Sequence, residues 1–470
     1  MIHSLSATLF GAFALVTMVF PLHAKSSAIR YEEIQVKAPF PMPAIQAPIF
    51  PERDFNITDF GAREGKEITE AVAKAIEACH EAGGGRVVIP AGKWKTGKIH
   101  FKSNVNLHIA KDAEVTFNPD PKAYLPAVQS SWEGFECFNY SSLIYAFQCE
   151  NVAITGEGTL KADMSIWKKW MGRPKPHLEA LKKLYHYTST NAPVEERQMA
   201  EGENNLRPPF IQFNRCKNIR IEGVKIRNSP FWTIHLYLCD SVLVRGLDIY
   251  AHGHNNDGID PEMTRNLLIE NCRFDQGDDA IAIKSGSNHD GWRHNTPSEN
   301  IVMRNCDIIE GHQLVAIGSE LSGGVRNVYV HDCKFAKGYR PFNLLFIKTN
   351  IRRGGFVDNI HMENITASSS RDGVFGIETD VLYQWRNLVP TIEERLTKIS
   401  NIHLSNIKIS ETATPFRISG DKRMPVENVT LHNITIDKVK GEKNSYKNAN
   451  NVKETDISIG EILPAEKKKK

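Results

Sequence analysis

The sequence lacks an excess of charge of either sign. Its 470 residues include 58 Lys and Arg against 55 Asp and Glu, which gives a formal net charge of +3 at pH 7. Because the basic residues are spread along the chain, nothing favours a nucleic-acid backbone or an anionic membrane as a partner. The basic run at residues 467–470 is typical of a solvated tail.

The sequence also lacks a membrane-length apolar run. The apolar stretch at residues 9–20 is shorter than the roughly 20 residues that span a bilayer. It precedes Leu22, His23 and Ala24, which resemble a small-residue cleavage site, so we predict a signal peptide over residues 1–24. The first residues contain His3 but no Lys or Arg, so an uncleaved N-terminal anchor stays the alternative. We expect an exported protein, periplasmic or extracellular, with no membrane insertion after cleavage and no lipid-modified Cys.

What is present is a repeat of Asn followed by two apolar residues separated by one variable residue. A degenerate copy begins at Ser241, and the full copies begin at Asn151, Asn218, Asn266, Asn300, Asn327, Asn359, Asn401 and Asn428. Each copy alternates with period 2 and leads into a second short run, which indicates short strands joined by tight turns. One such coil cannot bury its apolar side alone, whereas stacked coils form a continuous core. The repeat predicts an all-β fold, a right-handed parallel β-helix.

The repeat also sets the expected domain organisation. Residues 25–66 form an extended segment and the first strands, and residues 67–470 form a single β-helix domain. An amphipathic helix over about residues 68–82 ends at three glycines and is expected to cap the open end of the solenoid. Residues 164–208 interrupt the coil rhythm with prolines, tryptophans and a short helix near residues 177–185. Such an insertion projects from one face, often the binding face.

The cysteines follow the repeat. Cys272, Cys306 and Cys333 each stand six residues after their repeat Asn, and Cys216 and Cys239 stand two residues before a repeat start. Equivalent positions stack in neighbouring coils, so we expect ladders of buried, inert thiols rather than disulfides.

Acidic residues and a histidine stand just before strand-like runs in consecutive coils. Asp257 and the pair Asp278 and Asp279 are about one coil apart, and His312 and Lys348 follow at one further coil each. Because stacked strands lie about 4.8 Å apart, these side chains should line one lateral groove. Clustered carboxylates raise the pKa of at least one member, which supplies an acid beside a base.

Two neighbours of this cluster have a less certain role. Asp260 is expected to be structural and to bond turn amides. Lys284 either contacts substrate or neutralises the acidic cluster. His252, His254 and His289 show no ligand spacing, so we expect no metal and no cofactor.

Four ordered motifs carry a resemblance to a known family. They are NNDGID from Asn255, GDDAIAIKSG from Gly277, GH followed by IGSE from Gly311, and IKTN from Ile347. Three further segments, at residues 55–62, 83–92 and 228–235, extend the similarity over nearly the whole mature chain. Together they resemble glycoside hydrolase family 28, the polygalacturonase family.

The resemblance implies an inverting hydrolysis of a glycosidic bond. Asp278 would be the general acid that protonates the leaving oxygen, and Asp257 and Asp279 would position and deprotonate the attacking water. His312 would support the acid and its protonation state, and Asn255 would contact the sugar at the cleaved residue. Inverting enzymes generally hold acid and base roughly 6.5–9.5 Å apart, to leave room for water.

The substrate-binding residues show two departures from the family pattern. Lys348 matches the lysine that pairs with a substrate carboxylate, but Phe346 stands where the family usually has Arg. Gln313 stands where the family has Gly after the catalytic histidine. Residues 346 and 348 share a strand face, so a carboxylate clamp has become a flat apolar surface, unless Phe346 is a core residue. We therefore expect a leaving-side sugar that is neutral or branched, such as rhamnose.

The sequence thus predicts a secreted, monomeric hydrolase of α-galacturonosyl linkages in pectic poly- or oligosaccharides. The insertion at residues 164–208 could close one end of the groove, which favours exo action, on rhamnogalacturonan-type or branched fragments. One alternative is a polygalacturonase acting on unbranched homogalacturonan. A β-helix polysaccharide lyase and a non-catalytic carbohydrate-binding solenoid are alternatives of other classes.

Overall fold

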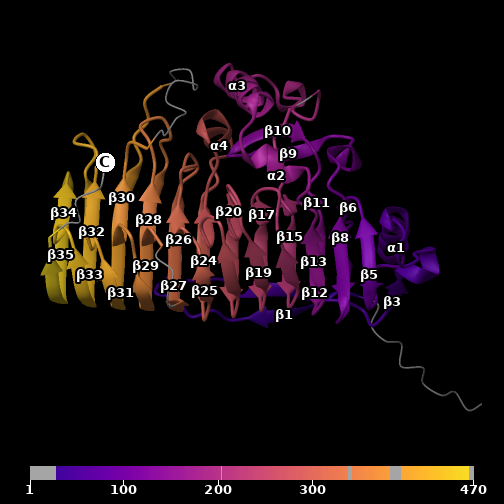
Figure 1. The fold of residues 1–470 in the computed structure, drawn as a ribbon, viewed down its shortest axis with the longest axis horizontal. Coiled ribbons are helices and arrows are strands. Elements are labelled where there is room, and N and C mark those ends of the chain that lie inside the picture. Colours follow the sequence, from indigo (N-terminus) through magenta and orange to yellow (C-terminus); the bar gives the residue numbers. More distant parts are fainter. Residues whose placement is uncertain (1–27, 203, 337–340, 382–392, 465–470) are drawn as a thin grey trace, which may run out of the picture.

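A computed structural model describes residues 28–202, 204–336, 341–381 and 393–464. The predicted signal peptide and the basic run near the C-terminus lie outside these ranges. Short strands stack in parallel register, coil upon coil, along one long axis (Figure 1). The fold is a parallel β-helix, as the repeat predicts, with the right-handed connections that parallel strands adopt.

Two sheets hold the coils. The sheet that will carry the site has 11 strands: β6 (Ile99–His100), β11 (Ile144–Phe147), β14 (Ile211–Asn214), β17 (Ile234–Tyr237), β20 (Ile259–Glu262), β23 (Ile281–Ile283), β26 (Gln313–Ile317), β28 (Asn343–Lys348), β30 (Gly373–Glu378), β32 (Phe416–Ser419) and β34 (Asn444–Lys447). The second sheet has 20 strands: β3 (Asp54–Asn56), β4 (Gly85–Ile89), β5 (Gly92–Thr96), β7 (Val105–Ile109), β8 (Ala113–Phe117), β12 (Glu150–Gly156), β13 (Thr159–Ala162), β15 (Lys217–Glu222), β16 (Lys225–Arg227), β18 (Asp240–Arg245), β19 (Asp248–Ala251), β21 (Arg265–Glu270), β22 (Arg273–Gln276), β24 (Ser298–Arg304), β25 (Asp307–Glu310), β27 (Val325–Phe335), β29 (Phe356–Ser369), β31 (Lys398–Thr412), β33 (Val426–Lys440) and β35 (Ala449–Leu463).

The repeat Asn forms the corner of each coil. Its backbone is left-handed, with φ of 58° at Asn266 and 56° at Asn300, a conformation that Asn tolerates better than most residues. The side-chain amide of Asn300 donates to Asn266 at 3.0 Å, and that of Asn327 donates to Asn300 at 2.9 Å. The apolar residue after each Asn points inward and stacks on its equivalent, as Leu267 does on Ile301. The repeat is therefore a turn followed by a core strand.

The cysteines form the expected ladders. All eight are buried free thiols, and none is in a disulfide. The thiol of Cys306 interacts with those of Cys272 and Cys333 in the neighbouring coils. Cys149 belongs to a second ladder with Cys216, because it too stands two residues before a repeat Asn.

The N-terminal end carries the expected cap and an additional strap. Helix α1 (Thr69–Glu81), which follows the short helix η1 (Ile57–Phe60), buries Val72, Ile76 and Cys79 against the first coils. Strands β1 (Arg30–Ile34) and β2 (Ile45–Ile49) pair antiparallel, and β1 runs along the solenoid axis across the coils (Figure 1). We call residues 30–49 the strap. Its β2 contacts β12, β15, β18 and β21.

The segments inserted between coils gather beyond the strand ends of the 11-stranded sheet (Figure 1). The insertion contains α2 (Trp167–Met171), α3 (Lys175–Ser189) and η3 (Val194–Glu196), so its main helix is longer than the short one predicted at residues 177–185. Proline at its N-terminus and the buried face of Leu181, Leu184 and Tyr185 explain that length. A hairpin of β9 (Val128–Trp132) and β10 (Phe135–Asn139), with η2 (Pro121–Tyr124) before it and α4 (Asn288–His294) beside it, was not predicted.

Candidate active site

The predicted catalytic residues stand in the turns that precede three consecutive strands of the 11-stranded sheet. Asp257 precedes β20, the pair Asp278 and Asp279 precedes β23, and His312 precedes β26. Backbone hydrogen bonds join these turns, since the amide of Gly258 donates to the carbonyl of Asp279 at 2.9 Å and that of His312 to Asp278 at 2.8 Å. The coil repeat therefore brings together residues up to 55 positions apart, as the spacing predicted.

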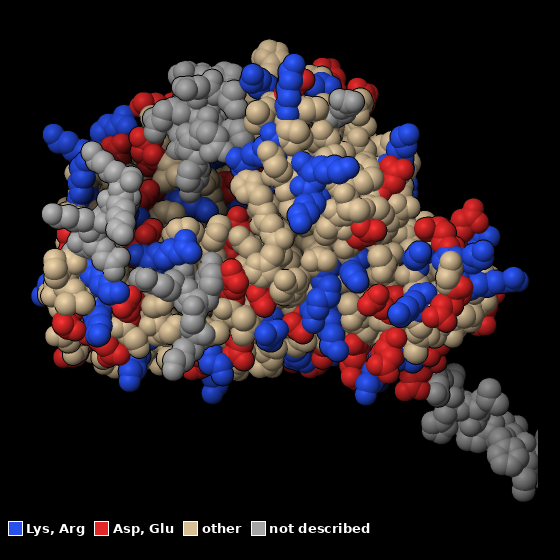
Figure 2. Space-filling view, viewed as in Figure 1, with Lys and Arg blue, Asp and Glu red and all other residues tan. Residues whose placement is uncertain are grey.

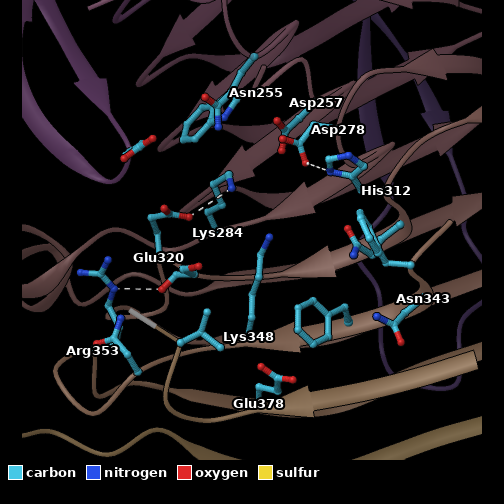
Figure 3. Close-up of a pocket in the computed structure, with 18 of the residues that line it drawn as sticks. Asn255, Asp257, Asp278, Lys284, His312, Glu320, Asn343, Lys348, Arg353 and Glu378 are labelled. Atoms are coloured by element: carbon cyan, nitrogen blue, oxygen red, sulfur yellow. Dashed lines mark hydrogen bonds and ion pairs between the residues drawn. The ribbon is translucent and has the colours of Figure 1, made fainter. Parts of the chain in front are cut away.

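The side chains of these turns form two close pairs. Nδ1 of His312 lies 3.0 Å from Oδ1 of Asp278 (Figure 3). Nζ of Lys348, on β28, lies 3.4 Å from Oδ2 of Asp279, a residue that is 1% exposed. Oxygen and nitrogen atoms of Asp278, Asp279 and His312 lie within 4.8 Å of one another.

Burial and charge give the carboxylates unequal proton affinities. Burial and the negative charge of Asp278 raise the pKa of Asp257 well above its ordinary value. Burial would also raise the pKa of Asp278, but the hydrogen bond and charge of His312 lower it to about 2. Burial raises the pKa of Asp279 although Lys348 opposes the rise. Burial would lower the pKa of His312, yet Asp278 raises it above its ordinary value.

Lys284 neutralises this cluster. Its Nζ lies 3.2 Å from Glu320 and 3.7 Å from Asp260, and 4.6 Å from the centre of the Trp232 ring. The interpretation of Asp260 as a residue that bonds turn amides is wrong. Asp260 is a fully buried residue of β20, and neither carboxylate oxygen accepts a hydrogen bond from the described residues. It faces the same side of the sheet as Lys284, whose charge balances it.

Asn255 is oriented from behind by a buried arginine. Its backbone is left-handed, with φ of 60°. The guanidinium of Arg207 is fully buried and donates to Oδ1 of Asn255 at 3.1 Å and to the carbonyls of His254 and Pro230. Because Oδ1 is held, the amide NH₂ of Asn255 is the group left for the cavity that this residue lines.

Phe346 lies in the cavity wall. Along the outward face of the 11-stranded sheet it stands in one column with Ala282, Ala316, Gly376 and Arg417. Its ring leans over Gly376, where an added Cβ would lie 3.0 Å from the ring. Phe346 is 8% exposed and lines the cavity, and so does Gln313 at the start of β26. Both sequence departures thus line the same cavity as Asp257, Asp278 and His312.

The cavity measures about 580 Å³, a size typical of small-molecule sites. Asn255, Asp257, Asp278, His312 and Lys348 line it (Figure 3). Figure 2 shows acidic and basic side chains together at a hollow between the α3 side of the molecule and the C-terminal coils. The insertion and hairpin contribute residues that the sequence reasoning did not find: Glu133, Phe135, Arg173 and Tyr185.

Comparisons with known proteins identify the family. The model of the family described as Glycosyl hydrolases family 28 matches residues 79–458. The chain belongs to this family. It is therefore a glycoside hydrolase, and the lyase and the non-catalytic solenoid are set aside.

Similar proteins agree with the family. A hyperthermoactive exopolygalacturonase from Thermotoga maritima is 38% identical, with a TM-score of 0.80 over 88% of this chain and 93% of that chain. A probable polygalacturonase from Vitis vinifera is 27% identical over 81% of this chain and 74% of its own length. The polygalacturonase from Erwinia carotovora, 22% identical with a TM-score of 0.64 over 89% of this chain and 99% of that chain, shares the fold.

Among the described residues of this family 28 chain, two groups have donor atoms close enough to hold a metal ion. One is Asp278, Asp279 and His312, where Lys348 already supplies a positive charge. The other is His252, Asp275 and Glu310, on successive coils, where Nε2 of His252 lies 2.7 Å from Asp275. The spacing of one coil per residue, which the sequence reasoning did not consider, brings this second group together.

No helix of the described residues is long and apolar enough to cross a membrane.

Proposed function

We propose that the protein releases single galacturonate residues from the non-reducing end of pectic oligosaccharides by inverting hydrolysis. The observation that carries the proposal is the Asp278–His312 pair, 3.0 Å apart, in a cavity that Asp257 and Lys348 also line. A proton donor, a group of carboxylates for water and a cation for a uronate stand there together. Exopolygalacturonases among the similar proteins support the exo mode.

The Asp278–His312 pair holds the proton for the leaving oxygen. Because the pKa of Asp278 is low and that of His312 is raised, the proton resides on the imidazole in the substrate-free site. When the glycosidic oxygen approaches Asp278, transfer along the hydrogen bond makes Asp278 the acid. General acid catalysis of this kind contributes typically 10²–10⁴-fold to a rate.

Asp257 and Asp279 position the attacking water. Oδ1 of each is buried and accepts no hydrogen bond from the described part of the chain. Of the two, Asp279 is the base, because Lys348 favours its ionised form, whereas Asp257 holds a proton more tightly. The 4.8 Å limit on the Asp278–Asp279 oxygens is shorter than the general inverting distance. The proposal of inversion therefore rests on the family to which the chain belongs.

The leaving side of the cavity suits a neutral or branched sugar. Phe346 offers an aromatic face, and beyond it Arg417 lies 2.9 Å from Glu378, so its charge is already balanced. A pyranose ring stacks on such a face through its C–H groups without needing a carboxylate partner. The favoured substrate is therefore a rhamnogalacturonan-type or branched fragment that ends in galacturonate.

A second candidate substrate is unbranched homogalacturonan. The observation that favours it is the 38% identity to an exopolygalacturonase. Lys348 on β28 and Arg417 on β32 stand two coils apart on the leaving side, and both could face a second uronate.

The test is product analysis on defined trisaccharides of both types. We expect galacturonate as the first and only monosaccharide product, formed faster from the rhamnogalacturonan trimer. Proton NMR of the first product should show the β-anomer, and an α-anomer would contradict inversion. Asp278→Asn is the control and should lose at least about 10³-fold in kcat. Release of oligomers from the middle of a long chain would contradict exo action.

We also propose that the protein is exported and works as a monomer. The support is the predicted signal peptide at residues 1–24. N-terminal sequencing of the mature protein should find Lys25 first, and light scattering should give the mass of one chain.

A further inference from the structure

The tip of the β9–β10 hairpin is pressed onto the ends of two strands of the site. Gly134 has φ of 82°, and an added Cβ would lie 2.4 Å from Oγ of Ser287 and 2.8 Å from Cγ of Glu320. The amide of Ser287 donates to the carbonyl of Gly134 at 2.9 Å, and its hydroxyl donates to the carbonyl of Glu133 at 3.1 Å. These contacts hold the backbone of Glu133 beside the cavity.

Buried ion pairs hold the base of the same hairpin. The carboxylate of Glu136, 2% exposed, accepts from Arg215 at 2.5 Å and lies 2.9 Å from His294 of α4. The amide of Glu136 donates to Asp290 at 2.9 Å, and Asp290 also pairs with the fully buried Arg197 of the insertion. These groups are desolvated and paired. Moving the hairpin would therefore break several buried ion pairs at once and leave their charges without partners. The hairpin is therefore a rigid support.

Glu133 and Glu320 face the catalytic pair across the cavity. Strands β23 and β26 follow the turns of Asp278 and His312 and run toward Lys284 and Glu320, so the hairpin tip lies at the opposite wall. Glu133 and Glu320 both line the cavity, and neither belongs to the Asp278–His312 pair or to the group that positions the water.

The surroundings of Glu133 raise its pKa, so that its carboxyl group can carry a proton near neutral pH. Burial and then the charge of Glu320 raise the pKa of Glu133 to about 7, while Arg173, Lys284 and Arg207 lower it. The hydroxyl of Tyr185 lies 3.5 Å from its Oε2. Lys284 keeps Glu320 ionised, since it lies 3.2 Å away and lowers the pKa of Glu320. One carboxyl that can donate thus stands beside one that accepts.

We propose that Glu133 and Glu320 bind the C4 hydroxyl of the terminal galacturonate and so make the enzyme specific for a free non-reducing end. The inference rests on the proposed exo action. In a pyranose ring C4 lies opposite C1, so a sugar with its anomeric carbon at Asp278 directs C4 across the cavity toward this wall. A hydroxyl both donates and accepts, which matches one protonated and one ionised carboxyl. A further uronate attached at C4 would bring a third carboxylate to this wall.

The test measures binding without turnover, in protein carrying Asp278→Asn. The two ligands are an oligosaccharide ending in galacturonate and its counterpart with a 4,5-unsaturated terminal residue, which has the same length and charge but no C4 hydroxyl. We expect the saturated ligand to bind about tenfold or more tightly by calorimetry, since a site built for a hydroxyl rejects ligands that lack it. Adding Glu133→Leu, which keeps a similar size but has no hydrogen-bonding group, should bring the two Kd values within about twofold.

The control is Glu378→Gln, which removes a carboxylate at the other end of the cavity and should leave the ratio of the two Kd values unchanged. Thermal melting checks that each variant folds. Equal affinity of the two ligands before the Glu133 change, or a ratio that survives it, would overturn the inference. If the wild type hydrolyses no galacturonate-terminated oligosaccharide, the proposed function fails, whereas the Kd ratio still decides the role of Glu133.

Discussion

At the scale of single residues, neighbours rather than residue type decide which carboxyl group carries a proton. Asp257, Asp278 and Asp279 are all desolvated, yet only Asp278 has a hydrogen-bonded histidine. Burial alone would leave all three protonated, and His312 outweighs it at Asp278 because an ionised carboxylate beside an imidazolium is strongly stabilised. In the proposed mechanism, His312 therefore supplies the proton that Asp278 donates.

The pH dependence of kcat/KM should follow His312. Its pKa is raised, so the Asp278–His312 pair holds its proton below that pKa and loses it as pH rises through it. We expect an alkaline limb above the ordinary histidine range, and Asp279, Lys348 and Asp278 are the charged groups that set its position. His312→Gln should remove this limb and lower kcat by about 10²-fold or more. An unchanged alkaline limb in the variant would contradict the assignment.

Phe346→Arg should shift specificity toward uronates on the leaving side. Gly376 beside it leaves room for the longer side chain, and a charge-assisted hydrogen bond to a carboxylate is worth about 1.5–3 kcal/mol. We expect the ratio of kcat/KM for trigalacturonate over a rhamnogalacturonan trimer to rise about tenfold. Phe346→Leu is the matched control, because it removes the aromatic face without adding charge and should slow only the rhamnogalacturonan trimer. Equal ratios in all three proteins would contradict the leaving-side role.

At the scale of elements, the hairpin β9–β10 and helix α3 add a wall to the lateral groove. They pack on each other through a separate apolar cluster that includes Trp132, Phe135, Leu181 and Leu184. The coils supply the reacting groups, and these excursions supply the opposite wall. The period of the repeat carries no information about this wall, because both excursions interrupt it.

Gly134→Ala should lift the hairpin tip. The added methyl group would meet Ser287 and Glu320, and alanine at φ of 82° costs about 1–2 kcal/mol on the backbone. We expect a lower Tm and a fall of about tenfold in kcat/KM. Gly65→Ala is the matched control, because its φ is 79° and nothing lies within 4 Å of the added carbon. The same loss of activity in both variants would show that the contact with Glu320 does not matter.

At the scale of the whole molecule, the strap covers an apolar stripe on the outside of the solenoid. Leu243, Leu268 and Val302 occupy the variable, outward position of three successive repeats and are fully buried beneath Phe40 and Ile45. In coils away from the stripe the same position can be polar, as at Arg220 and Thr430. The strap thus joins coils that otherwise contact only their neighbours.

Phe40→Ala should lower the stability of the solenoid without affecting catalysis. Loss of a buried phenylalanine ring costs about 3 kcal/mol, because the cavity left behind is only partly filled. We expect a Tm lower by several degrees in thermal melting. The kcat and KM at 25 °C should stay within twofold of wild type, since the strap packs on the sheet that does not carry the site. An unchanged Tm would show that the strap adds no stability.

Much of the site could be predicted from the sequence because the fold is periodic. The repeat Asn and its inward apolar neighbours mark each coil, so Asp257, Asp278 and His312 could be aligned by counting. The interpretation of Asp260 failed because counting does not show which side chains meet across coils, and there it faces Lys284. Gln313 and Phe346 could be singled out only against the family pattern.

The amino-acid sequence alone determined the solenoid, its capping helix, the cysteine ladders and the row of acids, because each depends on local alternation repeated at one spacing. The tertiary structure alone decided what stands opposite that row. Glu133, Arg173 and Tyr185 reach the cavity from excursions that do not follow the repeat. The contact that holds Glu133 there comes from Ser287, more than 100 positions further along the chain. The tertiary structure also decided which of the three aspartates holds a proton, because a pKa depends on burial and on charges in other coils.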